Sequence, residues 1–334
     1  MSNASLRIGL VGVGYWGKNL LRNFETLGAL AGFFDRSADI QAQYAALYPG
    51  ARVFQAFDDM LADDDIPAVA IATPAATHGE LVAQALRAGK HVFVEKPLCL
   101  DVREAEMLKR MADEKRLVLM VGHLLLYHSA FQALYEILKD GQLGNLRYIY
   151  SNRLSLGKIR REENALWSFA PHDISMILRL AGEMPRRVMA SAAHYLTDGV
   201  ADTTLSHLTF NDNLQAHIYV SWLHPFKEQK LVVVGDKAMI VFDDTKITAE
   251  KLLLYCHEVG WEGEIPIVSK AEPEPVSVLE SEPLRNECQA FLDAIDGTSR
   301  PPSDGAEGVR VLRILDACQR SILQNSSVDL DSGI

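Results

Sequence analysis

Short apolar runs alternate with segments of helical periodicity over the first third of the chain. Each run is too short to form a helix of ordinary length, and most are rich in Val, Ile, Leu, Ala or Phe. Continuous apolar strands that alternate with helices indicate a parallel sheet with helices on both of its faces. The expected strands are 6–11, 31–34, 68–72, 92–94 and 118–121, and the expected helices include 18–27, 79–87 and 102–115.

The pattern changes after His123. Between residues 214 and 222 apolar positions alternate with more polar ones, which predicts a strand with one buried and one wetter face. Several strand-like runs follow one another without helices between them, and this favours a largely antiparallel sheet. Further strands are expected at 187–196, 230–234 and 238–242, a turn at Gly235-Asp236, helices at 129–139 and 284–295, and a surface loop at 271–283.

We therefore expect an α/β protein of two domains. Residues 1–123 would form a doubly wound parallel sheet, and residues 124–334 an α/β domain on an open, mainly antiparallel sheet. A length of 334 residues agrees with two domains of ordinary size.

Composition and charge exclude several classes of protein. The net charge is −11 and no segment is rich in Lys or Arg, so we expect no nucleic-acid partner. No apolar run approaches the roughly 20 residues that span a bilayer, and residues 1–5 do not resemble a signal peptide, so we expect no membrane partner. The four cysteines form no CxxC pair, which predicts free thiols in a reducing cytoplasm and no metal site.

Gly12-Val13-Gly14-Tyr15-Trp16-Gly17 is a GxGxxG sequence, and it lies between the first expected strand and the first expected helix. Asp35 ends the next expected strand. This context predicts a dinucleotide-binding (Rossmann) loop, in which glycines let the backbone approach a pyrophosphate at a helix N-terminus. A carboxylate at Asp35 would bind the ribose hydroxyls and repel a 2′-phosphate, which favours NAD over NADP. Arg36 weakens that preference, because its guanidinium could bind the phosphate.

A series of further motifs in the same order resembles the Gfo/Idh/MocA oxidoreductase family, and the resemblance covers essentially the whole chain. These motifs are Thr73-Pro74 with His78, Glu95-Lys96-Pro97, Val121-Gly122-His123 and Ala170-Pro171-His172-Asp173. The resemblance implies a catalytic Lys96, which also contacts the substrate, and a cofactor site that includes Thr73, Pro74, His78, Glu95, Lys96 and His123. An ammonium group beside a reacting hydroxyl can stabilise the developing oxyanion. By itself, a lysine after a strand is more often a solvated surface charge.

The family's second-domain signature places an Asp four residues before a His, whereas this chain has Ser168 before His172. His172 is therefore the candidate general base, because imidazole titrates near neutral pH. Carboxylate assistance at 168 is in doubt, and a buried structural histidine is the alternative. Asp173 is expected to cap a helix over 174–180.

Several cations precede His172, and they suit an anionic substrate such as a nucleotide diphosphate. A solvated charged loop explains them equally well. The expected substrate-binding residues are Lys96, Arg153, Lys158, Asn164, Trp167 and His172.

The chain resembles the family branch that oxidises UDP-sugars at Gly157-Lys158, Trp167, Ala170-Pro171-His172-Asp173 and Ser221-Trp222-Leu223. That implies oxidation of the 3-hydroxyl of UDP-N-acetylglucosamine or its uronic acid. A free sugar or inositol as substrate, and an NAD(P)-binding regulator without catalysis, are the alternatives. The open sheet of such domains implies a homodimer or homotetramer.

Overall fold

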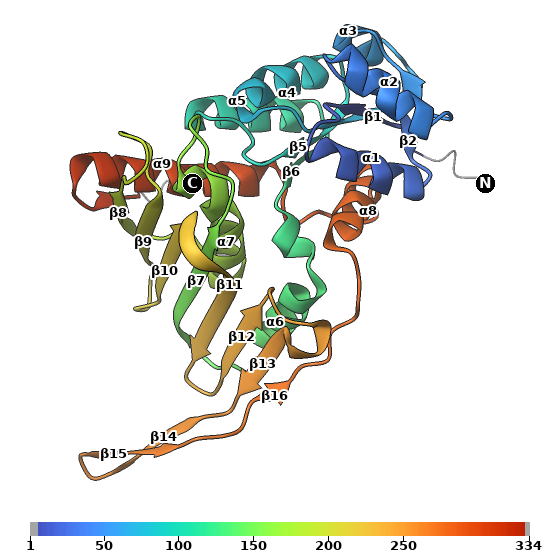
Figure 1. The fold of residues 1–334 in the computed structure, drawn as a ribbon. Helices are drawn as coiled ribbons and strands as arrows, with labels where there is room; N and C mark the ends of the chain where they lie inside the picture. The colour runs from blue at the N-terminus through green and yellow to red at the C-terminus, as the bar shows by residue number, and fades with distance from the viewer. Residues whose placement is uncertain (1–5, 331–334) are drawn as a thin grey trace. The chain divides into compact units, whose positions relative to one another are not determined.

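The computed structural model describes residues 6–330, and the first five residues, on which the signal-peptide expectation rests, lie outside this range. The chain divides into two compact units (Figure 1). The first unit comprises the chain up to Tyr127 together with Glu282–Leu312, and the second comprises His128–Ser281 and the chain from Arg313 onward. The segment Glu282–Leu312, which the sequence places in the second domain, thus packs with the first unit. The domain boundary after residue 123 stays a prediction.

A six-stranded parallel sheet forms the first unit, as the sequence predicts. Its strand order is β3-β2-β1-β4-β5-β6. The carboxyl ends of these strands meet at one edge, which is where open α/β sheets bind ligands. The strands are β1 (Ile8–Val11), β2 (Leu30–Phe34), β3 (Arg52–Val53), β4 (Ala68–Ile71), β5 (His91–Glu95) and β6 (Leu119–Gly122).

Helices cover both faces of this sheet. In Figure 1, α1 and α8 lie together on one face, and α4 and α5 lie together on the other. Ser37 and Asp101 cap α2 and α5 by accepting hydrogen bonds from backbone N–H groups of the first turn. The helical elements are α1 (Gly17–Thr26), α2 (Ala38–Leu47), α3 (Phe57–Leu61), η1 (Ala75–Thr77), α4 (His78–Arg87), α5 (Val102–Glu114), η2 (Leu124–Tyr127) and α8 (Pro283–Ile295).

The second unit is built on a nine-stranded sheet with the order β16-β13-β12-β11-β7-β10-β9-β8-β17. All its pairs are antiparallel except β7 with β10, so the expected antiparallel character is confirmed. The strands are β7 (Leu146–Leu156), β8 (Arg187–Ala193), β9 (Thr203–Thr209), β10 (Gln215–Ser221), β11 (Leu223–Gly235), β12 (Met239–Asp243), β13 (Leu252–Tyr255), β16 (Glu274–Pro275) and β17 (Val328–Asp329).

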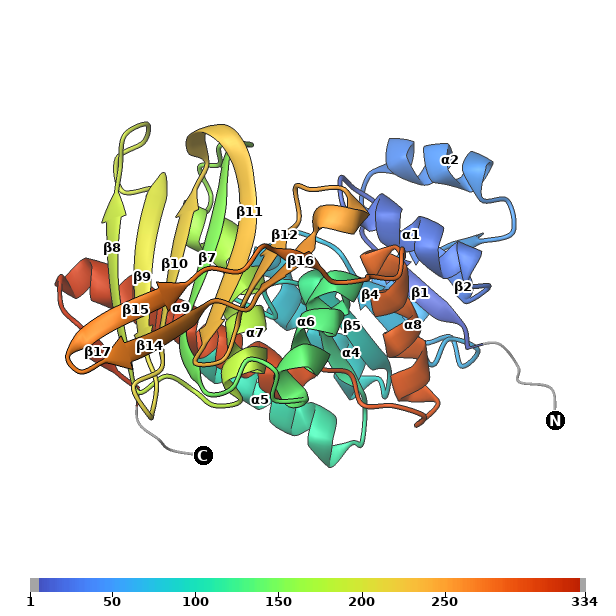
Figure 2. The same cartoon turned by 90° about the horizontal axis from the view of Figure 1, so that it is seen from below.

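One face of this sheet is covered and the other is open. Helices α6 (Ser129–Lys139) and α7 (Ala165–Ala181) pack on the covered face (Figure 2). Buried and exposed residues alternate along β8 and β9, as the two-residue period of a strand requires. The short η3 (Thr248–Glu250) precedes β13, and the long α9 (Gly305–Gln324) has residues in both units.

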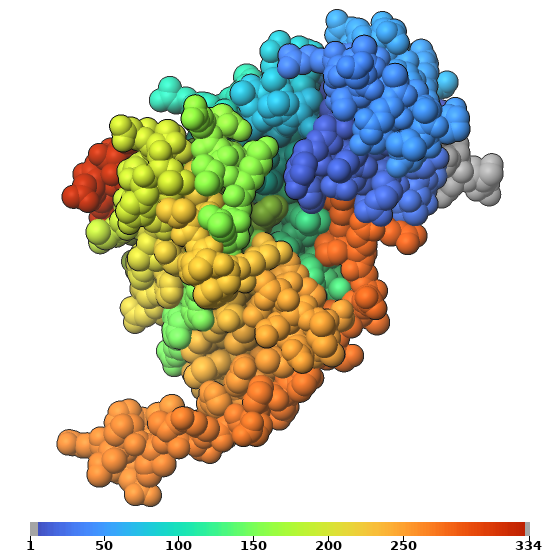
Figure 3. Space-filling model, viewed as in Figure 1, coloured from blue at the N-terminus to red at the C-terminus, as the bar shows by residue number. Residues whose placement is uncertain are grey.

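A two-stranded ribbon that the sequence analysis missed extends from the second unit. It consists of β14 (Glu258–Glu262) and β15 (Ile265–Ser269), and all ten of its residues are exposed. Figure 3 shows it in orange, standing clear of the rest of that unit. The period-two signal was present in the sequence, because Val259 and Trp261 alternate along the first strand and Ile265 and Ile267 along the second, with Gly263 between the strands.

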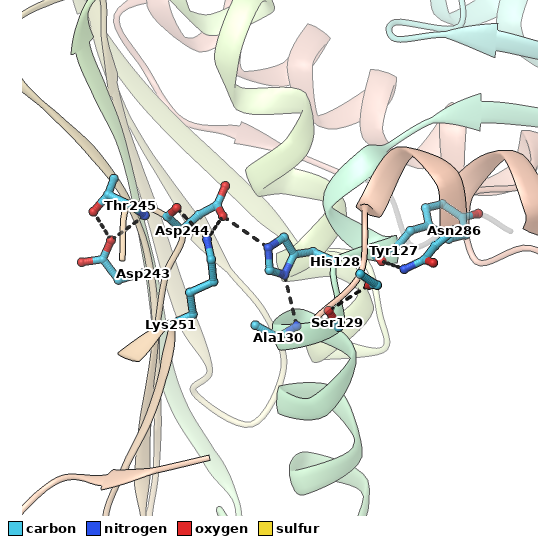
Figure 4. A network of polar contacts seen from close by, with 10 residues as sticks. Tyr127, His128, Ser129, Ala130, Asp243, Asp244, Thr245, Lys251 and Asn286 are labelled. Carbon is cyan, nitrogen blue, oxygen red and sulfur yellow. Dashed lines mark hydrogen bonds and ion pairs between the residues drawn. The ribbon is translucent and has the colours of Figure 1, made fainter. Parts of the chain in front are cut away.

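A polar network fixes the start of α6 to the β12–β13 connection (Figure 4). The Nδ1 atom of His128 accepts a hydrogen bond from the Ala130 N–H at 3.1 Å, and its Nε2 lies 3.3 Å from Asp244 Oδ1. Lys251 Nζ donates to the same Asp244 oxygen at 2.6 Å. Burial alone would raise the pKa of Asp244, but hydrogen bonds from His128 and Lys251 lower it to about 2.

The four cysteines are free thiols: Cys99, Cys256, Cys288 and Cys318. Within residues 6–330, no helix combines the length and the apolar content needed to cross a membrane.

Candidate active site

The glycine-rich loop connects β1 to α1, and its three glycines meet three different requirements. Gly12 has φ +87°, a backbone conformation that favours glycine. A Cβ on Gly17 would lie 1.9 Å from the carbonyl oxygen of Gly12, so no larger residue fits there. A Cβ on Gly14 would meet no protein atom within 4 Å. The loop is therefore closed on its inner side and open at Gly14, where a ligand can approach the backbone.

The loop leads directly into the N-terminus of α1, which favours negative charge. Trp16 occupies the N-cap position, and its side chain makes no capping hydrogen bond. Tyr15 is 83% exposed and Trp16 36% exposed, so both rings border solvent.

Asp35 accepts hydrogen bonds from the N–H groups of Val13 at 2.7 Å and Ser37 at 2.9 Å. Its carboxylate is thereby held against the loop, while the neighbouring Arg36 is exposed. A phosphate-bearing dinucleotide fits these features.

His78 joins the loops that follow β4 and β5. Its ring is buried, with Nδ1 2.7 Å from the carbonyl oxygen of Pro97 and Nε2 2.8 Å from that of Thr73. Burial lowers the pKa of His78. The side chain of Thr73 is in turn 2.7 Å from that of Thr77, and Pro74 begins the turn between them. A neutral imidazole has one N–H, so the His78 ring donates to one of these two carbonyl oxygens and lies against the other, and it presents no nitrogen to solvent.

Glu95 ends β5 beside the glycine-rich loop. Its Oε1 accepts a hydrogen bond from the indole Nε1–H of Trp16. Burial raises the pKa of Glu95 to about 7, although the indole hydrogen bond and the nearby charges of Lys96 and His123 oppose this increase. Lys96 follows at the carboxyl end of the strand and is partly exposed. The Glu95 carboxyl group can therefore change charge near neutral pH, next to the loop and Lys96.

His123 follows β6 and is 1% exposed. Its Nδ1 lies 2.5 Å from Oε2 of Glu307, a residue in the first turn of α9. This imidazole is engaged inside the first unit, and its cofactor contact stays a prediction.

In the second unit, α7 carries His172 and Ser168 one turn apart, so both lie on one side of the helix. Ser168 is buried and His172 is partly buried. The helix begins at Ala165, because the Asn164 side chain accepts a hydrogen bond from the Trp167 N–H at 3.1 Å. The Asn164 amide also donates to Gln319 at 3.0 Å. Two of its hydrogen-bonding positions are thus used for capping and packing.

The expectation that Asp173 caps a helix is wrong. Asp173 lies in the middle of α7 and is completely buried. Its Oδ2 accepts from Arg153 Nε at 2.8 Å, and its Oδ1 accepts from Arg153 Nη2 at 3.1 Å and from Ser151 Oγ at 2.6 Å. This pair could not be predicted from the sequence, because it depends on α7 packing against β7.

The structure separates the cations that were grouped before His172. Arg153 is 9% exposed and committed to Asp173, whereas Lys158 and Arg161 are exposed and Arg160 is half-buried in the loop before α7. Arg160 forms an ion pair with Glu163 at 3.0 Å. Lys158 and Arg161 are thus the more accessible cations of this group.

Two buried acids of the first unit were missed by the sequence analysis. They are Glu287 on α8 and Glu307 on α9, which are 0% and 3% exposed. The burial of Glu287 could have been predicted from the sequence, because Glu287 lies on the apolar side of α8 with Leu284, Cys288 and Phe291.

The parallel sheet, the glycine-rich loop and the acid after β2 define a dinucleotide-binding protein. Comparisons with known proteins agree. Residues 6–123 match the model of an oxidoreductase family with an NAD-binding Rossmann fold, and residues 131–241 match the Gfo/Idh/MocA C-terminal domain. The chain belongs to the Gfo/Idh/MocA oxidoreductase family.

Individual relatives match over nearly the full length of this chain. The chain is 31% identical to a UDP-N-acetylglucosamine 3-dehydrogenase of Acidithiobacillus ferrooxidans, over 92% of this chain and 94% of that protein. A solved structure of UDP-N-acetylglucosamine 3-dehydrogenase GnnA from this organism superposes with a TM-score of 0.83 at 29% identity, covering 95% of this chain and 98% of that one. An inositol 2-dehydrogenase of Rhizobium meliloti is 24% identical over 98% of this chain and 99% of that protein.

Proposed function

We propose that this protein oxidises the 3-hydroxyl of UDP-N-acetylglucosamine, or of its uronic acid, to a ketone with NAD⁺. The observation that carries the proposal is the match, over nearly the full length of both proteins, to a relative named for this reaction. The accessible cations Lys158 and Arg161 support it, because the diphosphate of a UDP-sugar is anionic. The proposed enzyme would act early in amino-sugar or polysaccharide synthesis, where a 3-keto sugar is the substrate of an aminotransferase.

NAD⁺ is the proposed cofactor and would lie along the glycine-rich loop. Its pyrophosphate would meet the backbone at Gly14 and the N-terminus of α1, and its adenosine ribose would meet Asp35. A 2′-phosphate would face the carboxylate of Asp35, so NAD⁺ is preferred over NADP⁺. When bound, the nicotinamide supplies the hydride acceptor.

The proposal gives His172 and Lys96 separate roles at the sugar hydroxyl. A ring nitrogen of His172 takes the hydroxyl proton, and the Lys96 ammonium stabilises the negative charge left on the oxygen. The neutral hydroxyl of Ser168 can hydrogen-bond but cannot supply the charge that the family's Asp would provide. Trp167 is proposed to border the sugar. Asn164 and Arg153 are proposed to shape the site through α7, since their side chains are used within the second unit.

The first experiment measures NADH formation from NAD⁺ with UDP-N-acetylglucosamine, its uronic acid, the free sugars and inositol. Lys96→Met and His172→Asn are each expected to lower turnover by roughly 10²- to 10⁴-fold. His207→Asn is the matched control, because this exposed histidine on β9 should leave turnover unchanged. Lys158→Met should raise the KM of the UDP-sugar and leave that of a free sugar unchanged.

Each other outcome has a definite meaning. Activity on inositol or free sugars alone would reject the UDP-sugar and keep a polyol dehydrogenase. Tight NAD⁺ binding with no turnover on any substrate would favour a regulator. Dimeric or tetrameric assembly and a cytoplasmic location stay predictions, and light scattering of the purified protein tests the assembly.

A further inference from the structure

Three segments of the second unit leave its sheet at the same edge. Strands β7, β8 and β10 run in one direction, because β7 pairs parallel with β10, and β8 and β10 both pair antiparallel with β9. The segments that follow their carboxyl ends are the loop 157–164, which leads into α7, the loop 194–202, which leads into β9, and Trp222, which leads into β11. Topology alone therefore brings these three parts of the chain together.

Asp202 ties two of these segments to each other. It is 1% exposed, and its Oδ2 accepts hydrogen bonds from the N–H groups of Tyr195 at 2.6 Å and Leu196 at 2.9 Å. Its Oδ1 accepts from the indole Nε1–H of Trp222 at 2.5 Å, and its carbonyl oxygen accepts from the Trp222 N–H at 3.2 Å. One buried carboxylate thus fixes the start of the loop between β8 and β9 to the end of β10.

Two backbone hydrogen bonds attach the third segment. The N–H of Gly157 donates to the carbonyl oxygen of Trp222 at 3.2 Å, and the N–H of Ala165, the first residue of α7, donates to that of Ala201 at 2.9 Å. His172 lies on the same side of α7 as Ala165, because seven residues make close to two helical turns. The loop between β8 and β9 is therefore attached to the segment after β7 and to the helix that carries the proposed general base.

Large apolar side chains are exposed around Asp202. Tyr195 is 70% exposed and Leu196 is 49% exposed. Leu156 and Leu223, which pair across β7 and β11 beside this node, are 69% and 39% exposed. Grouped apolar exposure marks an interaction surface, and a backbone already fixed by hydrogen bonds lowers the entropy lost when a ligand binds.

An aromatic ring and nearby cations are the two components with which proteins hold a nucleotide: the ring stacks on the base, and the cations pair with the phosphates. The edge that carries the exposed ring of Tyr195 also carries the exposed Lys158 and Arg161. We infer that Tyr195 stacks on the base of a nucleoside diphosphate, and that Asp202 is the positioning residue that holds Tyr195 in place for it. This inference rests on the proposed function and deepens it, because it assigns recognition of the nucleotide to the loop between β8 and β9.

The test is the affinity for UDP, measured by calorimetry with NAD⁺ present, since UDP carries no hexose to oxidise. Tyr195→Ala should weaken UDP binding roughly 5- to 150-fold, the range for removal of one base–aromatic stack, and Tyr195→Phe should retain most of the affinity. Trp261→Ala is the matched control, because this 67% exposed ring of the β14–β15 ribbon should not affect UDP. In turnover, Tyr195→Ala should raise the KM of the UDP-sugar and leave its kcat and the KM of a free sugar unchanged.

Asp202→Asn tests the positioning role. The amide keeps an acceptor oxygen for the indole of Trp222, but it turns an NH₂ group toward the N–H groups of Tyr195 and Leu196. Hydrogen exchange of these two amides should become faster, and UDP affinity should fall. Tyr195→Ala should then weaken UDP less in the Asp202→Asn protein than in the unaltered protein, because both substitutions remove the same stack.

The outcomes separate this inference from the proposed function. If Tyr195→Ala binds UDP as tightly as the unaltered protein, the inference is overturned and the proposed function stands, because the cations could still hold the diphosphate. If the unaltered protein binds NAD⁺ but no UDP, both are overturned. Strictly additive effects of the two substitutions would overturn the positioning role of Asp202. If Asp202→Asn does not fold, Tyr195→Ala still decides, because it alters an exposed side chain.

Discussion

Alanine at two glycines of the same loop should produce opposite defects. Gly17→Ala places a methyl group 1.9 Å from the Gly12 carbonyl oxygen, and ordinary contact begins at 3.4 Å. The carbonyl would have to retreat by about 1.5 Å, the difference of these distances. The obstacle is a backbone atom. The Gly12 N–H donates a hydrogen bond to the Phe34 carbonyl oxygen at 2.8 Å, so the loop cannot move without a cost in free energy. Gly14→Ala adds the same methyl group where no protein atom lies within 4 Å.

The magnitudes follow from this difference. Overpacking against fixed atoms costs about 1–3 kcal/mol, and the backbone obstacle places Gly17→Ala at the upper end of this range. For a unit of this size, about 3 kcal/mol lowers Tm by roughly 6–12 °C. Gly14→Ala should change stability by less than about 0.5 kcal/mol, as surface substitutions do. Its methyl group instead occupies the approach to the pyrophosphate and removes charge-assisted hydrogen bonds, which weakens NAD⁺ about 10-fold or more.

Thermal unfolding followed by circular dichroism and NAD⁺ titration by calorimetry separate the two effects. Gly17→Ala should have a lowered Tm without cofactor, and Gly14→Ala a normal Tm with weakened binding. The reasoning fails if Gly14→Ala binds NAD⁺ as tightly as the unaltered protein, because the open side of the loop would then not be the cofactor side. It also fails if Gly17→Ala keeps its Tm.

Three further predictions concern buried or partly buried charges. Asp244→Asn should lower the free energy of unfolding at pH 7 by about 1–2 kcal/mol, because the folded pKa of Asp244, about 2, lies below the unfolded value of 3.8. This stabilisation is present above pH 4 and is lost as the pH falls toward 2, so urea melts that show an equal effect of the substitution at pH 2 and pH 7 would contradict it. Arg153→Met should destabilise the protein by about 3–5 kcal/mol, because it leaves Asp173 buried and unpaired. Adding Asp173→Leu should restore much of this loss. If Arg153→Met instead raises the KM of the sugar substrate and leaves the urea melt unchanged, Arg153 belongs to the substrate site. Glu95→Gln should stabilise the protein by up to about 3 kcal/mol at pH 8 and by little at pH 5. The reason is that burial raises the pKa of the Glu95 carboxyl group from 4.5 to about 7, so folding becomes less favourable as the pH rises between these two values. A variant that is less stable than the unaltered protein at pH 8 would refute this.

The sequence by itself determined the features that depend on local backbone geometry. A loop that needs positive φ at Gly12 and no side chain at Gly17 can be made by few sequences, so the GxGxxG spacing was sufficient to predict it. Short apolar runs separated by helices similarly fixed the parallel sheet, because strands buried on both faces leave a continuous apolar signal. The ordered motifs from Thr73 to His172 were sufficient to identify the family.

The tertiary structure decided what each polar side chain does. In the sequence Arg153 belonged with the cations before His172, yet α7 packs on β7 and gives Arg153 to Asp173. His123 follows β6, and only the packing of α9 brings Glu307 to its ring. Such partners are separated by 20 to nearly 200 residues in the chain. Composition and periodicity are local properties, and the partner of a buried charge is chosen by contacts that form only when distant elements pack together.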